Sequence, residues 1–109
     1  MSASPAIHSV RDIHPALETG MERGGLLLEE ADLGPAFFDL RTGLAGELFQ
    51  QLTNYGLRLA LVVPDPASHG ERFAELAWEH RHHPTVRIFA SPAEAAQWIE
   101  ESATLRGTG

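Results

Sequence analysis

The sequence predicts an α/β fold in which a small sheet of mainly parallel strands is flanked by about four helices. Three short apolar runs, 26–28, 57–63 and 85–90, are long enough only for buried strands. An amphipathic helical pattern precedes each run and another follows the last, with Gly or Pro at the boundaries. Such alternation is typical of parallel strands joined by right-handed crossovers.

The first helix is predicted to begin after Asp12 as N-cap and to end at the glycine pair 24–25. Its apolar face is formed by Ile13, Leu17 and Met21. The strand 26–28 follows directly, and 34–35, a Gly-Pro pair, begins a new turn.

The second helix is predicted from Thr42 to Tyr55, with Gly56 as its left-handed cap. Apolar side chains recur along it at helical spacing: Leu44, Ala45, Leu48, Phe49, Leu52 and Tyr55. The strand 57–63 comes next and is stopped by the Pro-Asp-Pro at 64–66.

A third helix over 71–81, a strand over 85–90 and a fourth helix over 92–101 complete the pattern. The last helix opens with a capping-box sequence at 91–94. The inward-facing residues are expected to be Phe73, Leu76 and Ala77, then Ala95, Trp98 and Ile99. Trp78 is likewise expected to pack against the core or a helix rather than to stack on a ligand.

The organisation expected is one domain over 9–101, with flexible tails at 1–8 and 102–109. The net charge of −7 argues against nucleic-acid binding and favours a basic or neutral partner. Cysteine is absent, which excludes thiol chemistry and thiolate metal sites. With no apolar run of membrane length and no signal-like start, the expected location is the cytoplasm, and no cofactor is predicted.

The run 37–47, FFDLRTGLAGE, holds the main candidate site, at the start of the second helix. Its polar and glycine positions are Asp39, Arg41, Thr42, Gly43, Gly46 and Glu47. A helix start beside an arginine fork can bind phosphate or carboxylate. The alternative is structural: Thr42 caps the helix, Asp39 pairs with Arg41, and the glycines permit close packing.

Three further patterns are candidates for chemistry. Asp39 and Glu47 are candidates for a carboxylate pair, although no nucleophile accompanies them. Four residues at and after the end of the third helix suggest a metal site or a pH-sensitive patch: Glu79, His80, His82 and His83. Adventitious surface histidines are the favoured explanation, because adjacent histidines before a proline do not easily converge on one ion. Ser68 and His69 are neighbours in sequence, which does not give the geometry of a catalytic triad.

The stretch 37–55, FFDLRTGLAGELFQQLTNY, resembles the hallmark of the bacterial domain of unknown function 4180 family. The resemblance continues through the strand 57–63 and the segment 73–79, and ends in EAAQWI at 94–99. No activity is established for that family, so the resemblance implies a fold more than a function. Its members usually carry a hairpin before the first helix, where this chain has only 1–8; either the start is truncated or the sheet edge is covered otherwise, for example by a dimer partner.

Two departures from the family pattern follow: Pro-Asp-Pro at 64–66 replaces Gly-Asp-Phe, and the polar loop after the third helix carries histidines at 80–83. A looser similarity is to STAS domains, the anti-sigma-factor antagonists, whose switch Ser-Gly-Leu stands roughly where 42–44 stands here. The resemblance implies a site where a partner docks and where phosphorylation of Thr42 would alter docking.

Three functions fit these sequence patterns. The first is a non-catalytic regulatory or protein-interaction module acting through Asp39–Glu47, with a protein partner or a second copy. The second is a protein that binds a small anion or nucleotide through Arg41 and Thr42. The third is an enzyme that uses Asp39, Glu47 or Glu79 with a metal.

Overall fold

The structure is a computed structural model that describes the backbone of residues 6–107 and the side chains of residues 6–101. The elements, in chain order, are α1 (Ile13–Arg23), β1 (Leu26–Glu29), α2 (Pro35–Phe38), α3 (Leu44–Asn54), β2 (Leu59–Val62), α4 (Glu71–Glu79), β3 (Val86–Phe89) and α5 (Pro92–Gly107). Short 3-10 turns connect them: η1 (Val10–Asp12), η2 (Glu30–Asp32), η3 (Leu40–Thr42) and η4 (Pro66–His69).

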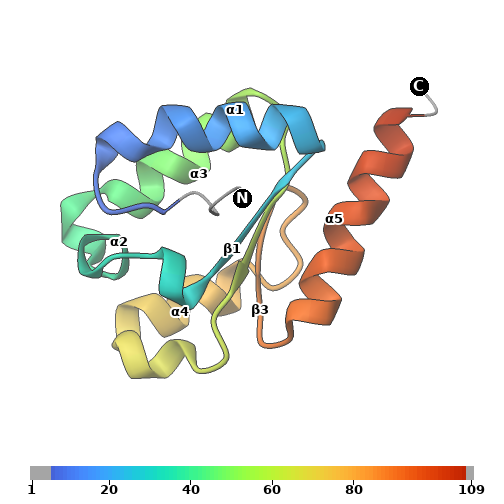
Figure 1. The fold of residues 1–109 in the computed structure, drawn as a ribbon. Helices are drawn as coiled ribbons and strands as arrows, with labels where there is room; N and C mark the ends of the chain where they lie inside the picture. The colour runs from blue at the N-terminus through green and yellow to red at the C-terminus, as the bar shows by residue number, and fades with distance from the viewer. Residues whose placement is uncertain (1–5, 108–109) are drawn as a thin grey trace.

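The strands form one three-stranded sheet in the order β1–β2–β3, and both pairs are parallel. The central strand β2 is buried along its whole length, as expected for a strand covered on both faces. Helices α1, α3 and α4 lie on one side of the sheet, and α5 covers the other (Figure 1). The crossovers through α3 and α4 therefore share one side, which confirms the predicted α/β fold.

Two apolar clusters hold the layers together. The larger one joins α1, α3 and α4 to the sheet, with Phe37 and Phe73 among its largest buried side chains. The smaller one lies under α5, where Ala95 and Trp98 contact Ala60 and Val62 of β2. Trp98 is thus a packing residue, as predicted.

Three apolar positions expected in the core are largely exposed: Met21 at 50%, Tyr55 at 53% and Trp78 at 65%. The last buried position of α1 is Gly20 instead of Met21. The helix approaches Leu57 closely there, since a Cβ at Gly20 would lie 3.4 Å from a Leu57 methyl. Tyr55 lies beyond the last turn of α3, as its C-cap. Trp78 lies at the sheet edge, with the Arg81 guanidinium 3.6 Å from its ring centroid.

The start of the second predicted helix is also different. A helix over Thr42–Tyr55 was expected, whereas α3 begins at Leu44 and Gly43 is its N-cap. Gly43 has φ +76°, a left-handed value that interrupts the helical path and separates the turn η3 from α3. The short helix α2 was not predicted, because its four residues carry too little periodicity to detect.

Ordered structure extends beyond both expected domain boundaries, residues 9 and 101. Ile7 is fully buried and forms a parallel bridge with Leu33, although 1–8 were expected to be a tail. At the other end α5 continues to Gly107, beyond the expected end at 101. The remainder of the predicted tails, 1–5 and 108–109, lies outside the described residues. Within the described part of the chain, none of the helices combines the length and apolar character that crossing a membrane requires.

Candidate functional site

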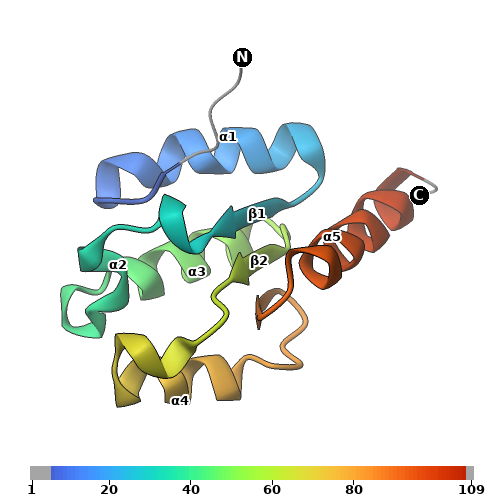
Figure 2. The same ribbon diagram turned by 60° about the horizontal axis from the view of Figure 1, so that its bottom comes forward.

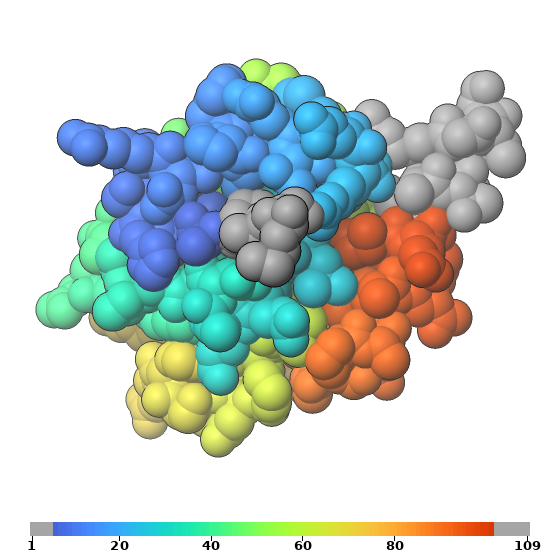
Figure 3. Space-filling model, in the orientation of Figure 1, coloured from blue at the N-terminus to red at the C-terminus, as the bar shows by residue number. Residues whose placement is uncertain are grey.

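The polar residues of greatest interest lie at the carboxyl ends of β1 and β2. The turn η2 follows β1, and η4 follows β2, so parallel pairing brings the two turns to the same end of the sheet. Figure 2 views the molecule with this end forward, and α2 and η3 lie beside it. In the space-filling view the teal segment after β1 lies directly against the yellow segment after β2 (Figure 3). Ligands of open parallel sheets bind at such an edge.

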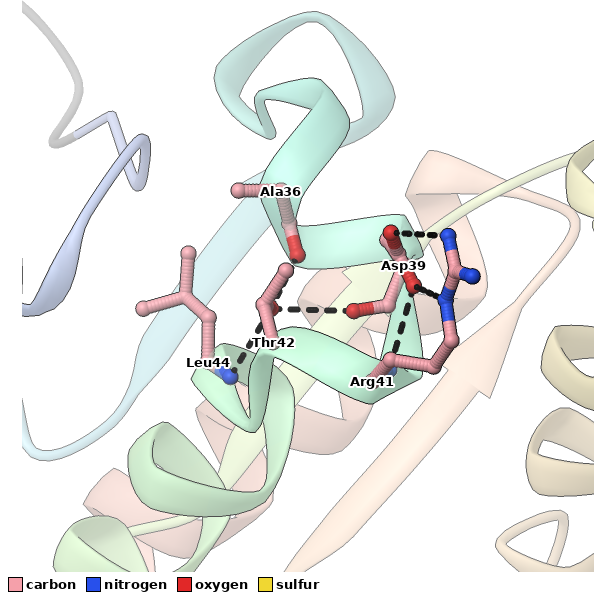
Figure 4. Close-up of polar contacts among 5 residues, drawn as sticks. All are labelled: Ala36, Asp39, Arg41, Thr42 and Leu44. Carbon is pink, nitrogen blue, oxygen red and sulfur yellow. Dashed lines mark hydrogen bonds and ion pairs between the residues drawn. The ribbon is translucent and has the colours of Figure 1, made fainter.

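Asp39 and Arg41 form a two-pronged ion pair on η3 (Figure 4). Arg41 Nε donates to Oδ1 of Asp39 and Nη2 donates to Oδ2, both at 3.0 Å, and the Arg41 backbone N–H adds a third bond at 3.1 Å. The side-chain hydrogen bonds from Arg41 are the main cause that lowers the pKa of Asp39, and the same bonds raise the pKa of Arg41. Arg41, although 84% exposed, therefore has its charge compensated within the chain.

The Thr42 hydroxyl connects α2 to α3 (Figure 4). It donates to the Ala36 carbonyl at 2.6 Å, with the Asp39 carbonyl a second acceptor at 2.9 Å. It also accepts a bond from the Leu44 backbone N–H at 3.2 Å. Thr42 thus satisfies the first N–H of α3, as a capping residue would, from one position before the N-cap. A phosphoryl group on this oxygen would have to replace these bonds.

The rest of the predicted site is separate from the ion pair. Glu47 Oε1 accepts a hydrogen bond from Gln51 Nε2 one turn further along α3, at 3.1 Å. Glu47 and Asp39 thus have different partners, and the carboxylate pair considered from the sequence is not formed. Gly46 is exposed, and a Cβ there would meet nothing within 4 Å, so close packing does not explain this glycine.

His69, for which the sequence indicates no function, has a central place in the structure. Its Nε2 lies 2.6 Å from Oε2 of Glu30, joining the turn after β2 to the turn after β1. Its ring stacks on Phe38 with centroids 3.6 Å apart and planes 5° apart. The available signal was position: each residue follows a predicted strand, and such residues meet at the carboxyl edge of a parallel sheet.

Two adjoining hollows, of about 490 and 510 Å³, surround this stack and share Phe38, Asp39 and His69. We call them together the His69 groove, which also includes Arg41, Glu71, Arg72 and Phe73 in the first hollow and Glu30, Leu33 and Pro35 in the second. Asp39 and Arg41 belong to the groove. Thr42, Gly43, Gly46 and Glu47 line neither of its hollows.

A third hollow, of about 310 Å³, adjoins the groove through Glu30 and brings two more carboxylates, Glu29 and Asp32. Oδ2 of Asp32 accepts a hydrogen bond from the Glu29 N–H at 2.9 Å. Among the described residues, neither carboxylate has an arginine or histidine ion-pair partner. The β1 end of the groove is therefore acidic.

Two of the histidines after α4, His80 and His83, use their rings as hydrogen-bonding groups. His83 Nδ1 accepts the N–H groups of Thr85 and Val86, both at 3.1 Å, and so caps the start of β3. His80 Nδ1 lies 2.9 Å from the Leu76 carbonyl. Over the described residues, no three His, Asp or Glu side chains are placed to hold a metal ion, which leaves the metal interpretation of Glu79 and His82 without supporting geometry.

Fold and site together define a small parallel α/β domain with a groove at the carboxyl edge of its sheet. The sequence model of the family described as Domain of unknown function (DUF4180) matches residues 1–99, and the chain belongs to that family. Neither a curated protein nor a solved structure matched the chain. The likeness to STAS domains stays a prediction.

Proposed function

We propose that this domain is a protein-interaction module that binds a basic segment of a partner protein in the His69 groove. The observation that carries the proposal is the Phe38–His69 stack lying between an apolar wall and a row of carboxylates. Leu33, Pro35 and Phe38 supply apolar surface for the stem of a long side chain. Glu30, on the same hollow, supplies a carboxylate acceptor for its charged head, whereas both oxygens of Asp39 already accept bonds from Arg41.

The state of the charges supports a cationic occupant over an anionic one. Arg41, the predicted anion clamp, already has the Nε–Nη2 edge of its guanidinium on Asp39. Phosphate would have to compete with a carboxylate held two residues away on the same turn. At the β1 end, Glu29 and Asp32 extend the negative charge, in a chain whose net charge is −7.

The shape supports a macromolecular partner. The hollows are open to solvent and lie side by side, whereas small-molecule sites enclose most of their ligand. The ion pair, the stack and the Thr42 bonds fix the surface before binding, which reduces the entropy cost of association.

The experiment is selection of short random peptides on the immobilised domain, followed by affinity measurement of the enriched peptides by calorimetry. The expected peptides carry Lys or Arg beside an apolar residue, and their affinity falls about tenfold in Glu30→Gln. The matched control is Glu18→Gln, because Glu18 also pairs with a histidine, His14 at 3.1 Å, but on the far helix α1. Peptides without basic residues, or equal losses in both variants, contradict the proposal.

One observation favours a second candidate, small-anion binding. Arg72 lines the groove beside Arg41 and has no acidic ion-pair partner among the described residues. This candidate predicts that pyrophosphate at low ionic strength raises the thermal midpoint of the wild type and leaves that of Arg72→Gln unchanged. An equal rise in the two proteins would contradict it.

A further inference from the structure

Strand β3 presents an open edge. The Leu59 and Val63 N–H groups donate to the Thr85 and Phe89 carbonyls, so alternate residues of β3 bond toward β2. The backbone N–H and C=O of Ile88 consequently point the other way, and no element of the described chain pairs with them. An unpaired edge of this kind favours pairing with another strand.

A groove of about 390 Å³ lies along this edge, between β3 and α4. We call it the β3 groove; its floor is formed by small or apolar side chains, Ala74, Ala77, Ile88 and Phe89. Beside this floor stands Trp78, 65% exposed, stacked under Arg81, whose Nη1 also donates to the Trp78 carbonyl at 2.7 Å. A large exposed side chain next to a shallow apolar hollow can fit a second copy of the same surface.

Opposite charges lie at the two ends of the β3 groove. Arg81 is in the loop that leads into β3, at its amino end. Asp65 follows β2, whose last residue Val62 is in register with Phe89, so Asp65 is at the carboxyl end. Among the described residues neither one forms an ion pair with an oppositely charged side chain.

We propose that a second copy of this chain occupies the β3 groove and forms a two-fold symmetric dimer with antiparallel β3 strands. A two-fold axis near Ile88 continues the sheet across both copies and pairs the free backbone groups. The same rotation brings each Trp78 over the other copy's alanines and each Arg81 opposite the other copy's Asp65. A strand of an unrelated protein could also pair with the backbone of β3, but it would place opposite charges at both Arg81 and Asp65 only by coincidence. In a two-fold dimer each of these residues meets the other automatically.

The first test is the molar mass of the purified full chain from low-micromolar to near-millimolar concentration, by sedimentation equilibrium. A monomer–dimer equilibrium is expected, weakened about tenfold or more by Trp78→Ala. Tyr55→Ala, which removes another exposed aromatic at the end of α3, is expected to leave the dissociation constant unchanged. A wild type that stays monomeric over this range overturns the proposal, and the β3 edge would then be a candidate site for a different protein. A dimer that Trp78→Ala does not weaken overturns it too.

The second test uses charge reversal, which distinguishes contacts between copies from contacts within one. Arg81→Glu places two acids at each end of the interface, and Asp65→Arg places two bases there. Each variant alone is expected to be monomeric where the wild type is dimeric. An equimolar mixture of the two is expected to dimerise, because each interface end then joins an acid to a base. Native mass spectrometry reports the mixed species directly, and its absence overturns the proposed pairing. Circular dichroism of each variant confirms that the fold is retained.

Discussion

The imidazole of His69 lies flat on the ring of Phe38, with centroids 3.6 Å apart, while its Nε2 contacts the Glu30 carboxylate at 2.6 Å. The side chain of His69, the last residue of η4, thus joins that turn to α2 and to η2. Phe38 also contacts Phe73 edge-on, with centroids 5.0 Å apart, so the stack is tied to the core. The stack at the centre of the His69 groove is therefore held by Glu30 through His69 and by the core through Phe38.

The two contacts of His69 can be separated by substitution. His69→Gln keeps a donor near the Nε2 position and loses the stack, while His69→Phe keeps the stack and loses the bond to Glu30. Each is expected to lower the free energy of unfolding by roughly 1 kcal/mol, and His69→Ala by about twice that. Urea denaturation measures all three. If His69→Ala is as stable as the wild type, His69 does not tie the groove together.

Thr42 is expected to matter for stability because its hydroxyl joins α2 to α3. Thr42→Val keeps the shape but removes the donor to Ala36 and the acceptor for Leu44, with an expected loss of about 1–2 kcal/mol. The control is Thr53→Val, an exposed threonine within α3. Thermal unfolding of the two variants gives the comparison, and equal midpoints would mean that the hydroxyl is free for another role, including phosphorylation.

Two glycines of the family hallmark are expected to respond in opposite directions. A Cβ would meet nothing within 4 Å at either Gly43 or Gly46, so sterics with neighbours do not distinguish them. Gly43 has φ +76°, and Gly43→Ala is expected to cost about 1 kcal/mol of unfolding free energy. Gly46 lies inside α3, and Gly46→Ala is expected to add up to about 1 kcal/mol, since alanine favours helix. Chemical denaturation that ranks the variants in the reverse order would contradict the assigned backbone roles.

Stability should fall in mild acid through His83. Its Nδ1 accepts two backbone N–H groups, which requires the neutral ring. Burial, with smaller contributions from the nearby charges of His80 and Arg87, lowers the pKa of His83 below its ordinary value of 6.5. Below that value the unfolded chain binds the proton more readily than the folded one, so stability decreases as pH falls from 6.5 toward the lowered pKa.

The matched variant for this titration is His83→Asn, whose side-chain oxygen can accept the same N–H groups and does not titrate. Urea unfolding across this pH range is expected to show a shallower slope for His83→Asn than for the wild type. Identical slopes would assign the pH dependence to other groups.

Much of the fold could be predicted because it depends on local patterns. The apolar runs, the helical stripe Leu44–Leu48–Leu52 and the alternation of elements predicted the parallel sheet that is present. The predictions that were wrong concern residues whose burial depends on tertiary contacts. Trp78 follows the apolar residues of α4, which predicts packing. Its side chain is nevertheless exposed, beside the open edge of β3. Ile7 was assigned to a tail because a single buried bridge leaves no periodic signal.

The candidate site was predicted in part. Asp39 and Arg41 are close in sequence, so their pairing followed from local chemistry, and it is present. Glu30 and His69 are 39 positions apart, and only the register of β1 with β2 brings them together. Neither residue belongs to a recognised motif, so the sequence alone could not join them to Asp39.

The most direct test of the proposed function is zero-length cross-linking of carboxylates to a selected peptide with a single lysine and a blocked amino terminus. This domain contains no lysine, so lysine-to-carboxylate links report the peptide's own position. Peptide mapping by mass spectrometry is expected to place the links on Glu29, Glu30, Asp32 or Asp39. Links spread over the exposed glutamates of α1 and α5, with none at the His69 groove, would contradict the proposal that this groove binds a basic segment.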